Sequence, residues 1–130
     1  MSSETPSRVL VVDDDRDVAE SLVMLLQYLG ADVRSAHDGA SGVEAAVSFQ
    51  PHIAFVDIRM PGIDGLETAR RIRQRLPDRA PFLVALTGLG QSEDRRRSKE
   101  AGFDLHLTKP VSAEALEQAL LQSEADPRKA

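Results

Sequence analysis

The sequence predicts an α/β fold in which a single parallel β-sheet is covered by helices on both faces. Short apolar runs alternate along the chain with longer segments whose apolar residues recur at helical spacing. Residues 9–12 and 53–56 are apolar at every position, which is typical of strands that are buried on both faces. Parallel strands need crossover connections, which are right-handed, so the alternation indicates βα units wound around one sheet.

Five strands are expected, and four of them are apolar runs that end in polar or loop-forming residues. The second strand differs, because Asp32 and Arg34 alternate with small or apolar residues before His37, as expected of an edge strand. The expected strands are residues 9–12, 31–36, 53–57, 82–86 and 103–107.

Five helices are expected between and after these strands, at residues 15–29, 39–49, 64–75, 91–101 and 113–122. Asp15 can cap the first helix and Gly30 can end it. The segment 91–101 has almost no apolar stripe, so this helix is expected to pack weakly and to be mobile or to wait for a partner. The residues expected to be buried are Val18, Leu22, Leu25, Leu26 and Leu29 in the first helix, Ala40, Val43, Ala46 and Val47 in the second, Leu66, Ala69, Leu76 and either Ile72 or the stem of Arg73 in the third, and Leu116, Ala119 and Leu120 in the last.

Length and composition point to one ordinary globular domain. The chain has 130 residues, of which 42% are hydrophobic and 28% charged, and it has no cysteine, which excludes disulfides and thiolate metal sites. A net charge of -5 disfavours nucleic acid as a partner, and the basic cluster Arg95–Arg97 is interpreted as a solvated helix face. No apolar run reaches the roughly 18 residues of a membrane helix, so a cytoplasmic protein without a membrane partner is expected. We expect a flexible lead at 1–7, the domain at 8–122 and a flexible tail at 123–130.

Polar residues of complementary kinds follow four of the expected strands. Asp13–Asp15 follow the first, Asp57 ends the third, Thr87 and Gly88 follow the fourth, and Lys109 and Pro110 follow the fifth. In a parallel α/β sheet, ligands bind at the carboxyl ends of the strands, so these groups are expected at one edge. Each of them alone also has an ordinary explanation as a turn, cap or surface residue.

The chemistry of this set indicates a magnesium ion beside a transferred phosphoryl group. Asp13, Asp14 and Asp57 would repel one another unless a cation intervened, and Mg²⁺ prefers oxygen ligands of this kind. Lys109 and Thr87 suit the oxygens of a phosphoryl group. Together these residues suit attack of Asp57 on phosphorus, which gives an aspartyl-phosphate.

At this point the sequence resembles the receiver domain of bacterial response regulators, over about residues 8–121. The resemblance rests on four motifs in order, which are Val11-Val12-Asp13-Asp14-Asp15, the segment 56–65 around Asp57, Ala85-Leu86-Thr87-Gly88 and Leu107-Thr108-Lys109-Pro110. It implies a flavodoxin-like, doubly wound sheet with strand order 2-1-3-4-5.

The resemblance also implies a role for each site residue. Asp57 would accept a phosphoryl group from the phosphohistidine of a histidine kinase or phosphotransfer protein. Asp14 and Asp57 would bind Mg²⁺ directly, Asp13 would help mainly through water, and the backbone carbonyl of Arg59 would be another ligand. Lys109 would pair with the phosphoryl group, and its bond to Pro110 would be cis.

The same resemblance implies a conformational switch and its partners. Thr87 would move onto the phosphate and rearrange the helix expected at 91–101. A downstream protein would bind the face formed by this helix, the strand 103–107 and the helix 113–122, and the chain would be a monomer or weak dimer without direct contact to nucleic acid. His106 departs from the family pattern, since it stands where a tyrosine or phenylalanine usually reports phosphorylation.

Several alternatives remain open at this point. The chain resembles receivers of hybrid sensor kinases in residues 87–97, so it would be either a stand-alone receiver or part of a larger protein. A magnesium-dependent phosphohydrolase would use Asp13 as nucleophile and Asp15 as acid. A pseudo-receiver would bind partners without phosphorylation, but such a protein is expected to lack an acid or the lysine, and this sequence lacks neither.

Overall fold

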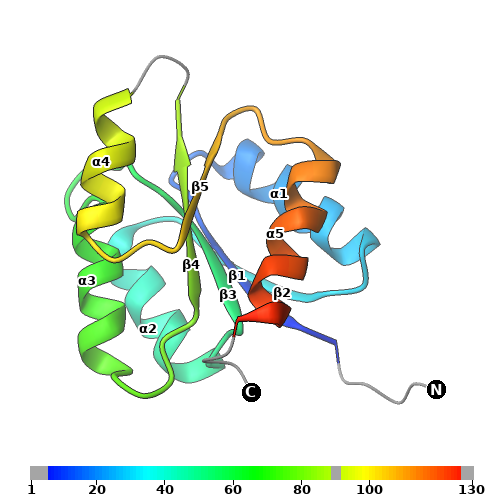
Figure 1. Ribbon diagram of the computed structural model, residues 1–130, viewed down its shortest axis with the longest axis horizontal. Helices are drawn as coiled ribbons and strands as arrows, with labels where there is room; N and C mark the ends of the chain where they lie inside the picture. The colour runs from blue at the N-terminus through cyan, green and yellow to red at the C-terminus, as the bar shows by residue number, and fades with distance from the viewer. Residues whose placement is uncertain (1–5, 89–91, 127–130) are drawn as a thin grey trace.

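A computed structural model describes residues 6–88 and 92–126. Its five strands form one parallel sheet in the order β2-β1-β3-β4-β5, as predicted (Figure 1). The strands are β1 (Arg8–Val12), β2 (Asp32–Ala36), β3 (Ile53–Asp57), β4 (Phe82–Thr87) and β5 (Leu105–Thr108).

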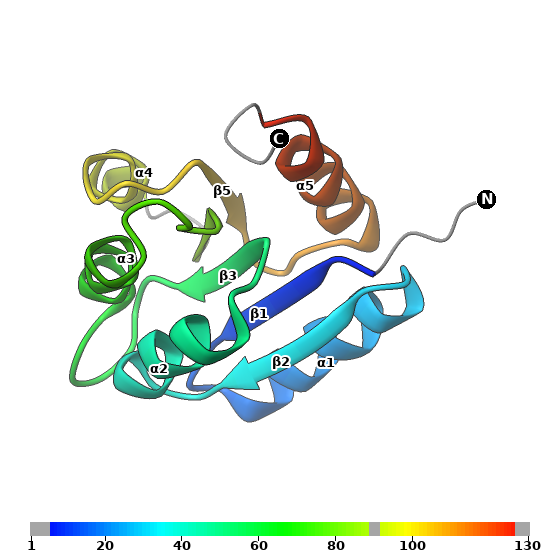
Figure 2. The same cartoon turned by 90° about the horizontal axis from the view of Figure 1, so that it is seen from below.

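Helices follow every strand and cover both faces of the sheet. In Figure 2, α1 and α5 lie on one face, and α2, α3 and α4 lie on the other. The helices are α1 (Arg16–Tyr28), α2 (Gly39–Phe49), α3 (Gly65–Arg75), α4 (Ser92–Glu100) and α5 (Ala113–Ala125). No helix in the described parts of the chain is both long enough and apolar enough to cross a lipid bilayer.

The sheet divides the hydrophobic core into two clusters, because successive strand residues point to opposite faces. In β1, Val9 and Val11 pack under α1 and α5, whereas Leu10 and Val12 pack under α2 and α3. All four are fully buried. This two-sided burial is the reason that the strand reads as a continuous apolar run in the sequence.

Side-chain caps explain where most of the helices begin. The carboxylate of Asp15 accepts hydrogen bonds from the backbone N–H groups of Asp17 and Val18, as predicted for the first helix. Asp64 and Ser112 cap α3 and α5 in the same way. Such caps satisfy N–H groups that have no partner inside the helix. The starts of these helices are therefore set by short-range signals.

The start of α3 also depends on a close backbone approach at Gly65. A Cβ atom at this position would lie 2.7 Å from Cα of Ile58 and would collide with the backbone carbonyl oxygen of Asp57. Only glycine leaves room for this contact. The first turn of α3 therefore lies directly against the end of β3.

The structure corrects several details of the prediction. In α2 the predicted burial of Val43 and Ala46 is confirmed, but Ala40 is exposed and Val47 is only partly buried, and the other buried residues are Gly39, Gly42 and Phe49. The last helix continues to Ala125 and buries Ser123, so the predicted tail starts too early. The fifth strand begins at Leu105 rather than at residue 103.

The helix predicted at 91–101 is α4, and Gln91 lies outside the described residues. Among the side chains described on this helix, only that of Ser98 is buried, and Ala101 is buried just beyond its end. The proposed mobility of α4 stays a prediction.

Candidate functional site

The four predicted polar groups meet at the carboxyl edge of the sheet, at the top in Figure 1. Strand register places them there, since Val12 is opposite Val56, Asp57 is opposite Leu86 and Thr87 is opposite Thr108. Parallel strands in this register bring their carboxyl ends together. The expectation of a single polar edge is therefore confirmed.

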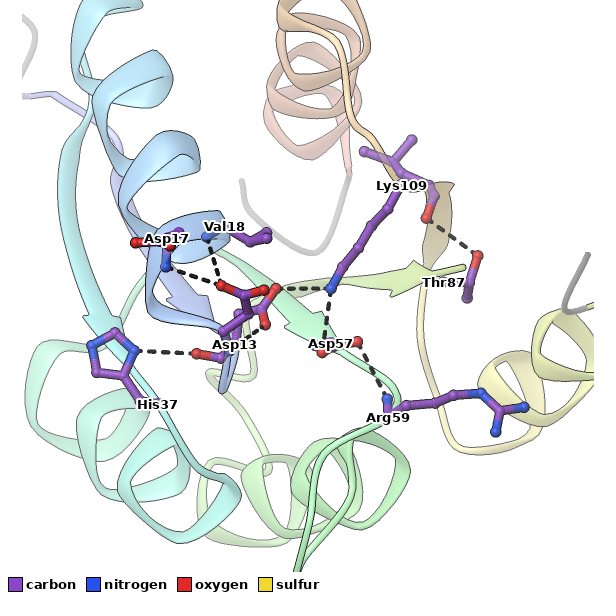
Figure 3. A network of polar contacts seen from close by, with 10 residues as sticks. Asp13, Asp17, Val18, His37, Asp57, Arg59, Thr87 and Lys109 are labelled. Carbon is purple, nitrogen blue, oxygen red and sulfur yellow. Dashed lines mark hydrogen bonds and ion pairs between the residues drawn. The ribbon is translucent and has the colours of Figure 1, made fainter. Parts of the chain in front are cut away.

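Lys109 joins the two carboxylates at the centre of this edge. Its Nζ atom lies 3.0 Å from Oδ2 of Asp13 and 3.3 Å from Oδ2 of Asp57 (Figure 3). The Lys109–Pro110 peptide bond is cis, as the family resemblance implied. Asp13 and Asp57 are both buried, whereas about a quarter of the Lys109 side chain is exposed. One ammonium group thus faces two carboxylates in a site that is largely shielded from solvent.

The charge balance of this trio shifts the pKa of two of its members. Burial raises the pKa of Asp57 from 3.8 to about 6, with a further contribution from the neighbouring Asp13 carboxylate, although Lys109 acts in the opposite direction. Burial alone would lower the pKa of Lys109, but the hydrogen bond and charges of its two acidic partners raise it overall. The ammonium group is fully compensated and the carboxylates are not, so the site favours an additional cation.

The donor atoms fit a hard divalent cation such as Mg²⁺. Asp13, Asp14 and Asp57 can each bring a carboxylate oxygen within 4.8 Å of the others. The Oδ2 atom of Asp13 is buried and accepts no hydrogen bond of good geometry from any described residue, although the Lys109 ammonium lies near it. An all-oxygen set whose buried Asp13 oxygen has only the Lys109 ammonium beside it is suited to magnesium, which takes one or two carboxylates and keeps several waters.

Arg59 contributes to the site through its backbone. Its N–H group donates a hydrogen bond of 3.3 Å to Oδ1 of Asp57, and its exposed side chain points away from Asp57 in Figure 3. This bond keeps the Asp57 carboxylate turned toward the loop that follows β3. The predicted role of the Arg59 carbonyl as a metal ligand remains a proposal.

Thr87 and His106 lie on the sheet face that α4 covers. The Thr87 hydroxyl donates a hydrogen bond of 3.3 Å to the carbonyl of Leu107 on the neighbouring strand, and Thr87 is buried. Register pairs Thr87 with Thr108 and Ala85 with His106, so Thr87 and His106 are diagonal neighbours. Burial lowers the pKa of His106, and the charge of Arg95 on α4 lowers it further. These two residues therefore connect the polar edge with α4.

His37 was not singled out as a site residue from the sequence, although it belongs to the same edge. Its Nδ1 atom lies 3.1 Å from the backbone carbonyl oxygen of Asp13. It follows the end of β2 directly, and that position was the only signal that could have identified it. The contact fixes the backbone on which Asp13 and Asp14 are placed.

The sequence model of the response regulator receiver domain matches residues 9–121. The chain belongs to this family. Receiver domains are signalling modules of two-component systems and are not classical enzymes.

Curated relatives of this receiver are longer proteins. The response regulator MprA of Mycobacterium ulcerans is 42% identical over 109 residues, which are 84% of this chain and 46% of MprA. The DNA-binding dual master transcriptional regulator RpaA of Synechocystis is 36% identical over 111 residues, which are 84% of this chain and 45% of RpaA. The receiver thus spans about half the length of the curated relatives it matches.

Solved structures of similar receivers match it over nearly their whole length. A putative response regulator from Chloroflexus aurantiacus is 30% identical with a TM-score of 0.86, covering 94% of this chain and 100% of that one. The receiver domain of the sensor histidine kinase PA1611 of Pseudomonas aeruginosa is 26% identical with a TM-score of 0.85 and the same coverage of both chains, and its structure has a magnesium ion in the active-site cleft. The solved relatives thus include both a response regulator and the receiver domain of a sensor kinase, and the resemblance of residues 87–97 to hybrid-kinase receivers stays a prediction.

Proposed function

We propose that this receiver acts in the cytoplasm and accepts a phosphoryl group on Asp57 from the phosphohistidine of a histidine kinase or phosphotransfer protein. The observation that carries this proposal is the ion-paired trio of Asp13, Asp57 and Lys109 at the carboxyl edge of the sheet. In the transfer, a carboxylate oxygen of Asp57 forms a bond to phosphorus while the bond between phosphorus and the imidazole nitrogen breaks. The nitrogen keeps the electron pair, and the product is an acyl phosphate.

The environment of Asp57 supports the role of nucleophile. Only 7% of the residue is exposed, which is enough to be reached from one side while the rest of its surroundings are closed to water. With a pKa of about 6, most of the carboxylate is ionised at neutral pH, and it is a more basic nucleophile than an exposed aspartate. The hydrogen bond from the Arg59 N–H group to Oδ1 fixes the orientation of the Asp57 carboxylate.

Asp13, Asp14 and Asp57 would hold Mg²⁺, together with the carbonyl of Arg59. When bound, the ion would neutralise charge on the phosphoryl oxygens and on the crowded carboxylates. Lys109 would then turn from its two carboxylate partners toward a phosphoryl oxygen, which a flexible point charge can do without a change of backbone. Thr87 would exchange its weak bond to the Leu107 carbonyl for a stronger bond to the phosphoryl group. The ion and Lys109 would act in the same way when water later attacks phosphorus, breaks the bond to the Asp57 oxygen and releases inorganic phosphate, so the receiver would catalyse its own phosphorylation and dephosphorylation.

The output would pass through α4, β5 and α5. In Figure 1, β5 forms the edge of the sheet between these two helices. A movement of Thr87 would reach His106 and then Arg95, whose charge already acts on the His106 ring. We propose that a downstream protein recognises the altered face, with the chain acting as a monomer or weak dimer.

The phosphohydrolase alternative fits the geometry less well. Asp13, its nucleophile, is completely buried, accepts a hydrogen bond from the Asp15 N–H group and pairs with Lys109. Asp15, its acid, is committed to capping α1. The two residues are therefore occupied by structural contacts that a phosphoester substrate would have to break.

Acetyl phosphate with Mg²⁺ provides a direct test. Intact-mass measurement should show an increase of about 80 Da that hydroxylamine removes, as expected of an acyl phosphate. Asp57→Asn should abolish the adduct, and Asp32→Asn on the exposed edge strand is the matched control that should retain it. An adduct that persists in Asp57→Asn, or that resists hydroxylamine, would refute the proposal.

A further inference from the structure

A basic cavity lies at the edge of the sheet opposite to Asp57, where the strands begin. Figure 1 shows this edge at the bottom. It has a volume of about 370 Å³ and lies between the start of β1, the end of α2 and the loop that follows α3. Its lining includes Arg8, His52, Arg73 and Arg79, with Asp78 as the one carboxylate. None of these residues contributes to the proposed phosphoacceptor site.

The positive charge of this cavity is only partly compensated. Arg73 donates to the Gly102 carbonyl and pairs with Asp104 at 3.1 Å. Arg8 and Arg79, in contrast, form no ion pair with any carboxylate in the described chain. Two uncompensated guanidinium groups at one cavity stand out in a chain whose net charge is -5.

Both of these arginines also keep donors that no described residue uses. Arg8 donates through Nε and Nη2 to the carbonyls of Phe49 and Gln50, which leaves its Nη1 group. Arg79 donates through Nη1 to the Gln50 side chain at 3.2 Å, which leaves Nε and Nη2. A guanidinium carries five N–H donors in a planar fork that matches the spacing of phosphate oxygens. The shared contacts with Gln50 bring the two forks to the same part of the cavity.

We propose that this cavity binds a small phosphate-bearing anion between Arg8 and Arg79. A phosphate dianion balances both guanidinium charges and can accept a hydrogen bond from each fork, whereas a single carboxylate would leave one charge uncompensated. The volume lies within the range of small-molecule sites, so a diphosphate group with or without a nucleoside fits. The site is separate from Asp57 and does not depend on phosphorylation.

Two-dimensional amide NMR of the unphosphorylated receiver tests this inference, with EDTA present to exclude Mg²⁺. Inorganic pyrophosphate should shift the amide signals of residues 50, 52 and 78–80 in a saturable manner, and leave those of residues 13, 57 and 87 in place. Adenosine diphosphate serves as the second probe. A lower Kd for this nucleotide would identify a nucleotide site, and equal Kd values would identify a site for the phosphate groups alone.

Arg79→Gln is the decisive variant, because Arg79 is exposed and its loss leaves the Arg8 contacts to α2 intact. It should raise the Kd for pyrophosphate about tenfold, as expected for one charge-assisted contact. Arg70→Gln removes an exposed arginine of α3 that does not line the cavity, and should leave the Kd unchanged. The inference is overturned if neither probe gives saturable shifts at these amides, or if both variants weaken binding equally.

Discussion

Replacing Asp57 with asparagine should stabilise the metal-free protein at neutral pH. The carboxylate is buried beside Asp13, and these two effects raise its pKa from 3.8 to about 6 despite the Lys109 ammonium. The folded protein therefore binds a proton at Asp57 more tightly than the unfolded chain does. Asparagine has nearly the same shape and carries no charge, so the variant avoids the cost of ionising this position.

The size of the effect follows from the pKa shift. A group whose pKa is raised on folding contributes stability below its unfolded value, and this contribution is lost as the pH rises through its folded value. For Asp57 this window runs from about pH 4 to about pH 6. A difference of about two pH units corresponds to about 3 kcal/mol, which is the upper limit for the gain at pH 7.

Urea unfolding followed by circular dichroism, in EDTA, measures this difference. The free energy of unfolding of Asp57→Asn should exceed that of the wild type at pH 7, and the gap should close as the pH falls toward 4. Asp32→Asn, in the exposed edge strand, should show no such gap. A variant that is no more stable than the wild type at pH 7, with the same pH profile, would refute the reasoning.

Four further substitutions test other parts of the structure. Gly65→Ala should lower the free energy of unfolding by about 1–3 kcal/mol, because the new methyl group collides with the end of β3; wild-type stability in urea would contradict the packing of α3. Asp104→Ala should lower the free energy of unfolding by about 1–3 kcal/mol, since the buried N–H group of Leu83 loses its acceptor at 2.9 Å. Glu44→Ala, which removes the exposed ion pair with Arg75, should lower it by less than about 1 kcal/mol. Lys109→Met should tighten Mg²⁺ binding, measured by calorimetry, because the ammonium group competes with the metal for the same carboxylates. The same variant should be phosphorylated more slowly by acetyl phosphate. Weaker Mg²⁺ binding would show that Lys109 positions the ligands instead.

The sequence predicted the strands and the polar edge because their signals are local. A run such as residues 53–56 can be explained only by burial on both faces, and Asp57 follows it at the point where the strand must end. Parallel topology then gathers the ends of distant strands without further information. Short motifs therefore sufficed to predict which residues form the site. Their closeness in space followed from the rule that the carboxyl ends of parallel strands lie at one edge of the sheet.

Hydrogen bonds from side chains to backbone carbonyl groups far along the chain have no comparable local pattern in the sequence. Arg8 bonds to the end of α2, more than 40 residues away, and Arg73 bonds to the carbonyl of Gly102. In the sequence Arg8 looks like an ordinary surface arginine, and for Arg73 only the burial of its apolar stem was considered. The burial of Ser123 was missed for a related reason, since a serine near the chain end looks like part of a polar tail. These features depend on tertiary packing rather than on periodicity.

The division of the core by the sheet limits how far a signal from the phosphoacceptor site has to travel. Thr87 and His106 face the layer that holds α4, whereas Leu105 and Leu107 contact the cluster under α1 and α5. The two proposed switch residues therefore face α4 directly, whereas α5 lies on the other side of the sheet. A rearrangement that also reached α5 would have to pass around the edge strand β5.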